Sequence, residues 1–544
     1  MLLQISSSSS SSSSFQHRPI SSTSSYSKPI PWFNPTSIQN PHNKNHSISC
    51  WIPKVYNNKK KTTAKKYESK PLHKWTGVYK RISLLENPDV GSAFVLDQFD
   101  KEGKSLSRWE LCRVVKELRK FRRFKLALEV YEWMNEREDR FALSSSDAAI
   151  QLDLISKVRG VASSEEYFSN LPGTLKDKRT HGSLLNAYVR ARMKEKAEAL
   201  VEDIKNKGYA LHPLPYNVMM TLYMKHKDYD KAISMVTEMM DKNISPDIYS
   251  YNIWITACGS MGSTEKMEEV LERMKMDSTV SPNWTTYSTM ATMYMNLGQL
   301  DKAKASLRMV EGSITGRERI PFHYLLSLYG SIGEKEEVYR IWNTYKSSFP
   351  TIPNLGYHSM IGSLVRLDDI EGAVKIYEEW LPHRSTYDPR ICNLVLGWYV
   401  KKGMLEKAGD FLDQVLEVGG KANAYTWELL AEGHINEKHI YEALSCVKKA
   451  TLAEGGKGWR PKPTFVSCFL SLCEHHSDNA SKEVFMDLLK QLGCLEDEAY
   501  MLLVNSNGKA DFGLDVSVDK DGFDSDNDED SGADMLLNQL EGSL

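Results

Sequence analysis

The sequence predicts an all-α fold, a right-handed α-solenoid superhelix of stacked helix-turn-helix units. Two residue classes recur with one period through the middle of the chain. Aromatic residues fall at Tyr216, Tyr251, Tyr287, Phe322 and Tyr357, and small or apolar residues at Ala197, Ala232, Met267, Ala303, Val338, Ala373, Ala408 and Ala443. Both series step by 35 residues, with one shared step of 36. A period of about 20–50 residues indicates stacked supersecondary units rather than one globular core.

Each unit reads as two helices, as the segment 213–247 illustrates. Its apolar residues recur at the i, i+3, i+4, i+7 spacing of a helical face, first at Tyr216, Met219, Met220 and Tyr223, then at Ala232, Met235, Val236 and Met239. A turn is expected at Lys227-Asp228, and Pro246 is expected to stop the second helix. Other units carry glycine at the turn, at Gly262, Gly298, Gly333 and Gly403. One such hairpin cannot bury its own apolar face, so the units must stack.

In chain order, the first segment is a leader at residues 1–70. It is rich in serine, has no Asp or Glu before Glu68, and carries a charge of about +9. This composition is typical of an organellar transit peptide, with a disordered cytosolic tail as the alternative. Because arginine is scarce, we expect the chloroplast, with the mitochondrion as the alternative.

The rest of the chain divides by the quality of the repeat. We expect an N-terminal helical cap at 71–107, degenerate repeats at 108–177, well-registered repeats at 178–461, and a degenerate repeat with a cap at 462–510. The segment 511–544 carries about −10 and is expected to be a disordered acidic tail.

The residues at the repeated positions resemble the pentatricopeptide repeat family. The segments Asp247-Ile248-Tyr249-Ser250-Tyr251-Asn252 and Leu214-Pro215-Tyr216-Asn217-Val218-Met219 are similar to the family's opening signature. The competing interpretation is the tetratricopeptide repeat, a protein-binding hairpin with a period of about 34 residues. The step of 35 residues, the Tyr-Asn pairs and the Pro-Asp ends favour the pentatricopeptide repeat.

The resemblance implies single-stranded organellar RNA as the partner, read one base per repeat. In that family the fifth and last residues of a unit select the base, and an apolar second residue wedges it. The pair Asn217 and Asp247 then implies uridine, and the pairs Asn252 with Asn283 and Asn393 with Asn423 imply a pyrimidine. Further readout candidates are Ser288, His358 and Asp388, and the wedge candidates are Leu214, Ile320 and Leu355.

Several units depart from the family pattern. The fifth residue is Gly182, His323 or Glu428 in three of them, and a glycine offers no side chain to a base. The body 71–510 carries only about −1, which predicts modest or locally directed nucleic-acid binding. Its best phosphate-binding surface is Arg113, Lys116, Arg119, Lys120, Arg122, Arg123 and Lys125, for which a solvated helix face is the alternative.

Catalysis finds little support in the sequence. The H-x-E and P-C-x-x-C signature of the zinc deaminases does not occur, and no glycine-rich phosphate loop is complete. The eight cysteines form no CxxC pair, so we expect neither a metal nor a cofactor. We expect an RNA-binding protein that acts by occupancy in RNA stabilisation, processing or translation, with the ribosome or other RNA-processing proteins as further candidate partners. A protein-binding scaffold that has lost RNA readout is the alternative.

Overall fold

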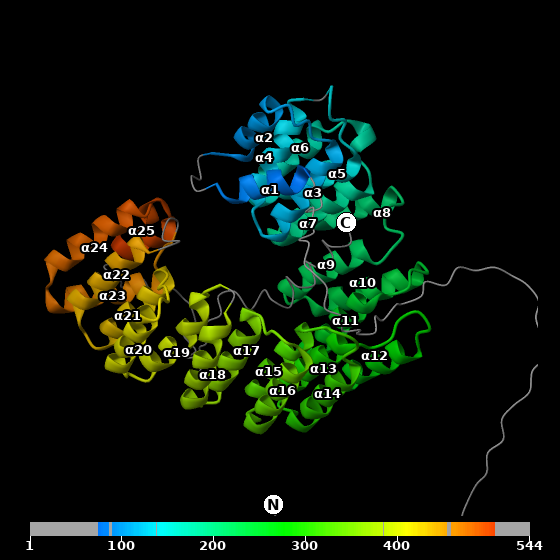
Figure 1. Cartoon of the computed structure of the whole chain (residues 1–544). Helices are drawn as coiled ribbons and strands as arrows, with labels where there is room; N and C mark the ends of the chain where they lie inside the picture. Colours follow the sequence, from blue (N-terminus) through cyan, green and yellow to red (C-terminus); the bar gives the residue numbers. More distant parts are fainter. Residues whose placement is uncertain (1–73, 86–89, 138, 385, 454–458, 506–544) are drawn as a thin grey trace, which may run out of the picture. The chain divides into compact units, whose positions relative to one another are not determined.

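The computed structural model describes residues 74–85, 90–137, 139–384, 386–453 and 459–505 (Figure 1). The regular elements in these ranges are 25 α-helices and two short 3₁₀ helices, Gly173–Leu175 and Cys494–Glu496. None of the described helices is long and apolar enough to cross a membrane. The predicted leader 1–70 and the predicted acidic tail 511–544 lie outside the described residues.

Most of the helices form consecutive antiparallel pairs. The pairs are α3 (Arg108–Lys120) with α4 (Phe124–Asn135), α5 (Ser145–Val158) with α6 (Val161–Asn170), α7 (Lys178–Arg190) with α8 (Lys194–Asn206), α9 (Leu214–Lys225) with α10 (Tyr229–Asp241), α11 (Ile248–Ser260) with α12 (Thr264–Met276), α13 (Trp284–Asn296) with α14 (Leu300–Ser313), α15 (Ile320–Ser331) with α16 (Lys335–Ser348), α17 (Asn354–Arg366) with α18 (Ile370–His383), α19 (Pro389–Lys401) with α20 (Leu405–Glu417), α21 (Ala424–Asn436) with α22 (Ile440–Leu452), and α23 (Pro463–His476) with α24 (Asn479–Gln491). Helices α1 (Lys74–Ser83) and α2 (Ser92–Lys101) precede them, and α25 (Glu498–Asn505) follows.

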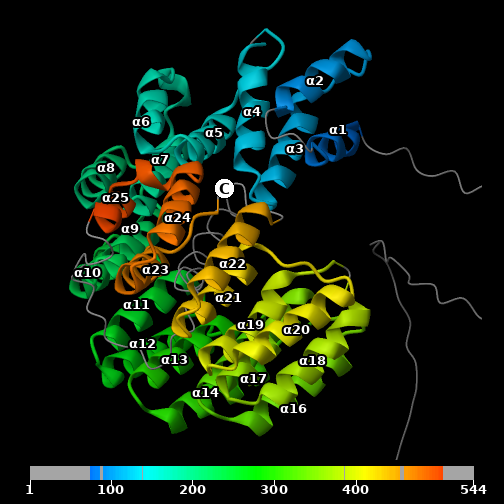
Figure 2. The same cartoon turned by 90° about the vertical axis from the view of Figure 1, so that its left-hand side faces the viewer.

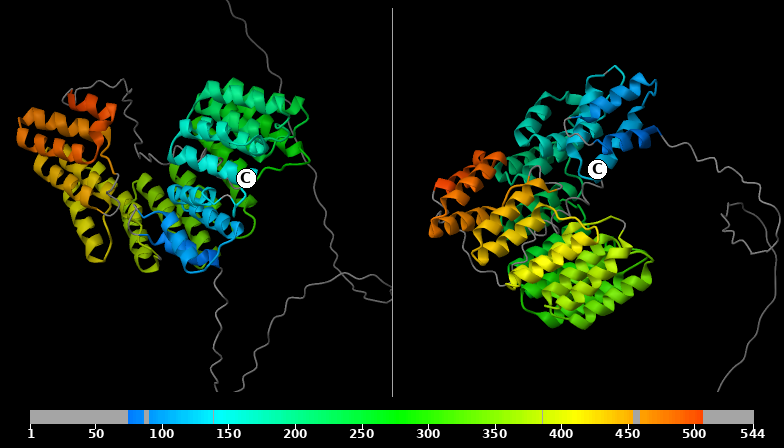
Figure 3. Two further views of the ribbon diagram at one scale, coloured as in Figure 1. Left: turned by 90° about the horizontal axis from the view of Figure 1, so that it is seen from above. Right: turned by 60° about the vertical axis from the view of Figure 1, so that its left-hand side comes forward.

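The hairpins stack through their first helices. Each first helix packs against the first helix of the next hairpin, from α5 through α7, α9, α11, α13, α15, α17, α19 and α21 to α23. We call this row the first-helix layer. Figures 2 and 3 show the same succession of neighbouring hairpins from other sides. The predicted all-α solenoid of stacked helical hairpins is confirmed.

The two periodic series lie in the core of the stacked hairpins. Every member of the small or apolar series, from Ala197 to Ala443, is fully buried on a second helix. The aromatic series lies on the first helices, where Tyr216, Tyr251, Phe322 and Tyr357 are buried and Tyr287 is half-buried. Small side chains at the first series let neighbouring backbones approach closely. The period seen in the sequence is therefore the period of core packing.

The hairpin turns use left-handed backbone geometry. Gly262, Gly298, Gly333 and Gly403 all have positive φ, as predicted, and Lys227 adopts φ 57° at the same place in its hairpin. The expectation for Pro246 was wrong. Helix α10 already ends at Asp241, where Asn243 turns the chain with φ 57° and the Ile244 amide donates to the Met239 carbonyl at 3.0 Å. The αL turn stops the helix before the proline is reached.

Candidate nucleic-acid interface

Asn217 and Asp247 meet at the junction of two hairpins. Asn217 lies on α9, and Asp247 is the N-cap of α11. The Asn217 amide nitrogen Nδ2 donates to Asp247 Oδ1 at 3.0 Å, and the Ser250 hydroxyl donates to Asn217 Oδ1 at 2.7 Å. Because a carboxylate only accepts, Asp247 fixes the orientation of the amide. Asn217 is fully buried, so its hydrogen-bonding atoms are covered in the free protein.

A second junction has the same arrangement. Asn393 Nδ2 donates to Asn423 Oδ1 at 3.3 Å, and the Thr426 hydroxyl donates to Asn393 Oδ1 at 2.8 Å. Asn423 caps α21 and accepts the Thr426 backbone amide, which fixes Asn423 Oδ1 as the acceptor. The two predicted pairs are therefore brought together, each with a hydroxyl from the next helix.

The third predicted pair, Asn252 and Asn283, is arranged differently. Asn283 caps α13 by accepting the backbone amides of Thr285 and Thr286, and it also accepts the Thr285 hydroxyl at 2.6 Å. Asn252 Nδ2 then donates to Thr285 Oγ1 at 3.1 Å, so Thr285 bridges the pair. Asn252 is 6% exposed, and its Oδ1 has no hydrogen-bond partner among the described residues.

The next two fifth positions also hold incompletely bonded polar atoms. Ser288 Oγ and His323 Nδ1 are buried and have no partner within the described part of the chain. His323 Nε2 lies 2.9 Å from the Tyr345 hydroxyl. Burial, together with the nearby Arg319 charge, lowers the pKa of His323 to about 4, so the ring is neutral at pH 7.

Asp388 and Glu428 have partners that occupy their oxygens. Asp388 pairs with Arg390, with 2.8 Å between Oδ2 and Nη2. Burial is the largest single influence on the pKa of Asp388 and opposes ionisation, but the hydrogen bonds and charge of Arg390, together with the charge of His358, outweigh it and lower the pKa of the carboxyl group. Glu428 accepts from Trp459 Nε1 at 3.1 Å and from the Lys462 amide at 2.9 Å. Glu428 therefore anchors the segment that leads into α23.

The three wedge candidates differ in exposure. Leu355 is 55% exposed and Ile320 is 40% exposed, each in the first turn of its helix. Leu214 is half-buried and packs against the core. Two of the three therefore present apolar surface at the start of a first helix.

The predicted basic surface lies on α3 and the start of α4. Lys116, Lys120, Arg122, Arg123 and Lys125 are exposed. The other two cations are half-buried and make contacts within the protein. The Arg113 guanidinium lies over the rings of Trp75 and Trp109, with 5.6 Å and 5.7 Å to the ring centroids, and Arg119 pairs with Asp153 at 3.4 Å. Trp109 is 61% exposed, so an aromatic face accompanies the exposed cations.

The hydroxyl partners Ser250, Thr285 and Thr426 were missed in the sequence. A signal for two of them was present, because Ser250 and Thr426 stand three residues after a helix N-cap and form capping boxes. The capping box predicts the backbone contacts of these hydroxyls. Their contacts with a residue 33 positions earlier depend on how the hairpins stack.

The chain is similar to one family over most of its length. The PPR repeat family matches residues 215–260, and the PPR repeat matches 179–209, 249–278, 357–381 and 390–419. The pentatricopeptide repeat-containing protein At1g02150 of Arabidopsis thaliana is 53% identical over 488 residues, which cover 90% of this chain and 92% of that protein.

Two more distant matches also have pentatricopeptide repeat names. The Arabidopsis thaliana large ribosomal subunit protein mL101 (rPPR4) is 36% identical, over 79% of this chain and 86% of that protein. Among solved structures, the pentatricopeptide repeat protein PPR10 from maize is 16% identical with a TM-score of 0.46, and the match covers 75% of this chain and 63% of PPR10.

Proposed function

The chain belongs to the pentatricopeptide repeat family, and we propose that its first-helix layer binds single-stranded RNA. The observation that carries the proposal is the row of polar side chains at the fifth positions of successive hairpins. Asn217 and Asn393 each bond to the last residue of their own unit, and Asn252, Ser288 and His323 each keep a buried polar atom without a partner among the described residues. Buried polar atoms of this kind normally have a hydrogen-bond partner, and the edge of an RNA base supplies one.

The hydrogen-bond orientations suggest how the row reads bases. At Asn217 the oxygen is occupied and one amide hydrogen is used, so the amide offers its second hydrogen to a carbonyl oxygen of a pyrimidine. At Asn252 the amide donates internally, and its free oxygen requires a donor from the base. Because Asn217 is fully buried, a base reaches it only after the side chains that cover it move.

The remaining contacts of the RNA follow from the exposed side chains. Ile320 and Leu355 expose apolar side chains that wedge against base faces in this proposal, and the exposed cations of α3, of the turn after it and of the start of α4 contact phosphates. We propose that the protein acts by occupancy, with no catalytic step. A bound strand is then shielded from nucleases and held out of self-pairing.

Changing the Asn217–Asp247 pair tests the readout. We expect Asn217→Ser combined with Asp247→Asn to change the preferred base at one position of RNA selected from a random library. The other selected positions are the internal control, because the two changes are confined to one junction. An unchanged preference at every position would contradict readout by these residues.

Ribosome association is a second candidate function. It is favoured by the 36% identity to a protein named as part of the large ribosomal subunit. Sedimentation of an organellar extract tests it. Co-migration with the large subunit that survives nuclease treatment of non-ribosomal RNA would support this role, and migration only in the free fractions would remove it.

We also propose that the protein works in an organelle. The leader composition favours the chloroplast, whereas five similar Arabidopsis thaliana proteins are named mitochondrial. A fluorescent fusion to residues 1–70 distinguishes the two destinations. A diffuse cytosolic signal would contradict both.

A further inference from the structure

Gly182 stands where the row of fifth-position side chains is interrupted. It lies within α7, and a Cβ atom added there would meet no other atom of the described chain within 4 Å. The space beside it is a pocket of about 490 Å³, walled by α5, α7, the end of α8, the segment between α8 and α9, and the start of α9. Pockets of about 300–1,000 Å³ are the usual size for small-molecule ligands. Here the missing side chain leaves room for a ligand.

This opening contrasts with the next junction along the layer. Asn217 is fully buried and bonded to Asp247 and Ser250, so a base must displace covering groups before reaching it. At Gly182 the fifth position itself has no side chain to displace. Because a purine exceeds a pyrimidine by one ring, the space left by the absent side chain suits the larger base.

The wall of the pocket carries groups that match a base. Leu214, which is half-buried, supplies apolar contact for a flat ring, and the buried Leu185 and Val218 complete the apolar wall. Asn186 follows Gly182 by one helical turn, and its Oδ1 is buried without a hydrogen-bond partner in the resolved helices. An asparagine amide pairs in two places with the N6 and N7 edge of adenine. The amide of Asn186 therefore favours adenine among the purines.

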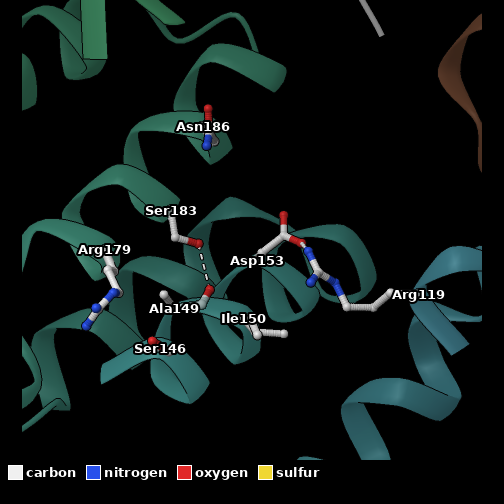
Figure 4. Close-up of a pocket in the computed structure, with 8 residues that line it drawn as sticks. All are labelled: Arg119, Ser146, Ala149, Ile150, Asp153, Arg179, Ser183 and Asn186. Atoms are coloured by element: carbon white, nitrogen blue, oxygen red, sulfur yellow. Dashed lines mark hydrogen bonds and ion pairs between the residues drawn. The ribbon is translucent and has the colours of Figure 1, made fainter. Parts of the chain in front are cut away.

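Positive charge surrounds the pocket. Lys178 and Arg179, both exposed, line it at the start of α7. A smaller adjoining hollow, shown in Figure 4, shares Ser146, Arg179 and Asn186 with the pocket and adds Arg119 and Asp153.

Asp153 does not neutralise this region. Three cations converge on its single carboxylate: Arg119 at 3.4 Å, Lys157 at 3.2 Å and Arg190 at 3.1 Å. Arg179 pairs with Asp177 at 3.3 Å, and Lys178 adds a further exposed cation. The cations therefore outnumber the carboxylates from Arg119 on α3 to Lys178 on α7, which suits the phosphates on either side of a bound base.

We propose that the pocket beside Gly182 binds a purine of the RNA strand, adenine in preference, with adjacent phosphates on Lys178 and Arg179. This inference rests on the proposed RNA-binding function. It assigns a reading position to a unit whose fifth residue has no side chain.

Filling the pocket tests the inference. We compare the wild-type chain with Gly182→Leu by selection from a random single-stranded RNA library and by titration with a selected RNA. The matched control is Gly409→Leu, since Gly409 also lies inside a helix, α20, and also has open space at its Cβ position. We expect Gly182→Leu to lose the purine preference at one position. We also expect it to weaken RNA binding by about fivefold to a hundredfold, which is the effect of losing the stacking of one base. Gly409→Leu should behave as wild type.

A second variant keeps the test decisive if Gly182→Leu folds poorly. Asn186→Ala removes only the amide and should reduce the preference for adenine over guanine at that position. If the wild type binds RNA and both variants keep its affinity and its preferences, the pocket inference is wrong and RNA binding stands. If the wild type binds no RNA, both proposals fail.

Discussion

At the scale of single residues, the fifth positions divide by how their hydrogen bonds are satisfied. Asn217 and Asn393 each use one amide hydrogen and the amide oxygen internally, because a serine or threonine on the next first helix donates to the oxygen, and only the second amide hydrogen is left for a ligand. Asn252 lacks that donor and keeps a bare oxygen. Identical asparagines at equivalent repeat positions therefore present different groups to a ligand. One neighbouring hydroxyl decides the difference.

Removing one of these hydroxyls should destabilise its junction. Ser250→Ala leaves Asn217 Oδ1 buried without a donor, and an unsatisfied buried acceptor costs about 1–3 kcal/mol. We expect a loss of that size in the local unfolding free energy of α9 and α11, measured by hydrogen exchange. Ser234→Ala is the control, because Ser234 is exposed and bonds only to the Lys231 carbonyl within its own helix. Equal effects from the two changes would contradict the role of Ser250.

His323 should make the middle of the layer sensitive to acid. Burial and then the Arg319 charge lower its pKa to about 4 in the folded chain, against 6.5 ordinarily. The stabilisation is complete above pH 6.5 and is lost as the pH falls toward 4, because the unfolded chain binds the proton first. Between pH 7 and 5 we expect α15 to lose about 2 kcal/mol more local stability in the wild type than in His323→Gln. Hydrogen exchange of α15 measures this, and equal losses would contradict the assignment.

At the scale of elements, the hairpin is fixed by its turn and its core positions. The sequence predicted the helical pairs because apolar residues at helical spacing and glycines at the turns agree with each other. It failed at Pro246, because the αL turn at Asn243 has no strong sequence signal and ends α10 first. The positive φ of Lys227 could not be predicted either, since lysine rarely adopts a positive φ. The stacking of the hairpins, rather than the conformational preference of the residue itself, holds such residues in the left-handed region.

A reciprocal pair of substitutions tests the turn. Lys227→Gly should stabilise the α9–α10 hairpin by about 0.5–1 kcal/mol, because a non-glycine residue in the left-handed region is strained. Gly262→Lys should destabilise the α11–α12 hairpin by a similar amount, since its Cβ would meet no other described atom and only φ opposes it. Thermal unfolding of both variants checks the signs. Changes in the same direction would show that the turn geometry does not control stability.

At the scale of the whole molecule, the described residues form one row of first helices that carries the candidate site. The period of 35 predicted this row, and the repeat positions selected the pairs Asn217–Asp247 and Asn393–Asn423 as readout candidates. In the structure the two members of each pair are hydrogen-bonded to each other, and their contact with a base stays a prediction. The sequence could not predict that Asn217 is covered while Gly182 opens a pocket, because both depend on packing between neighbouring hairpins. It also could not show that Arg119 is engaged by Asp153. RNA binding therefore has to be measured.

Titration of the chain with single-stranded RNA at about 50 mM and about 200 mM salt is the most direct measurement. If the first-helix layer and the cations of α3 and α4 bind a strand through about four phosphates, affinity should fall roughly 50-fold between these conditions. The Asn217→Ser, Asp247→Asn variant should keep that salt dependence, because it alters base contacts and leaves the phosphate contacts in place. Absence of RNA binding even at the lower salt concentration would contradict RNA recognition by this protein.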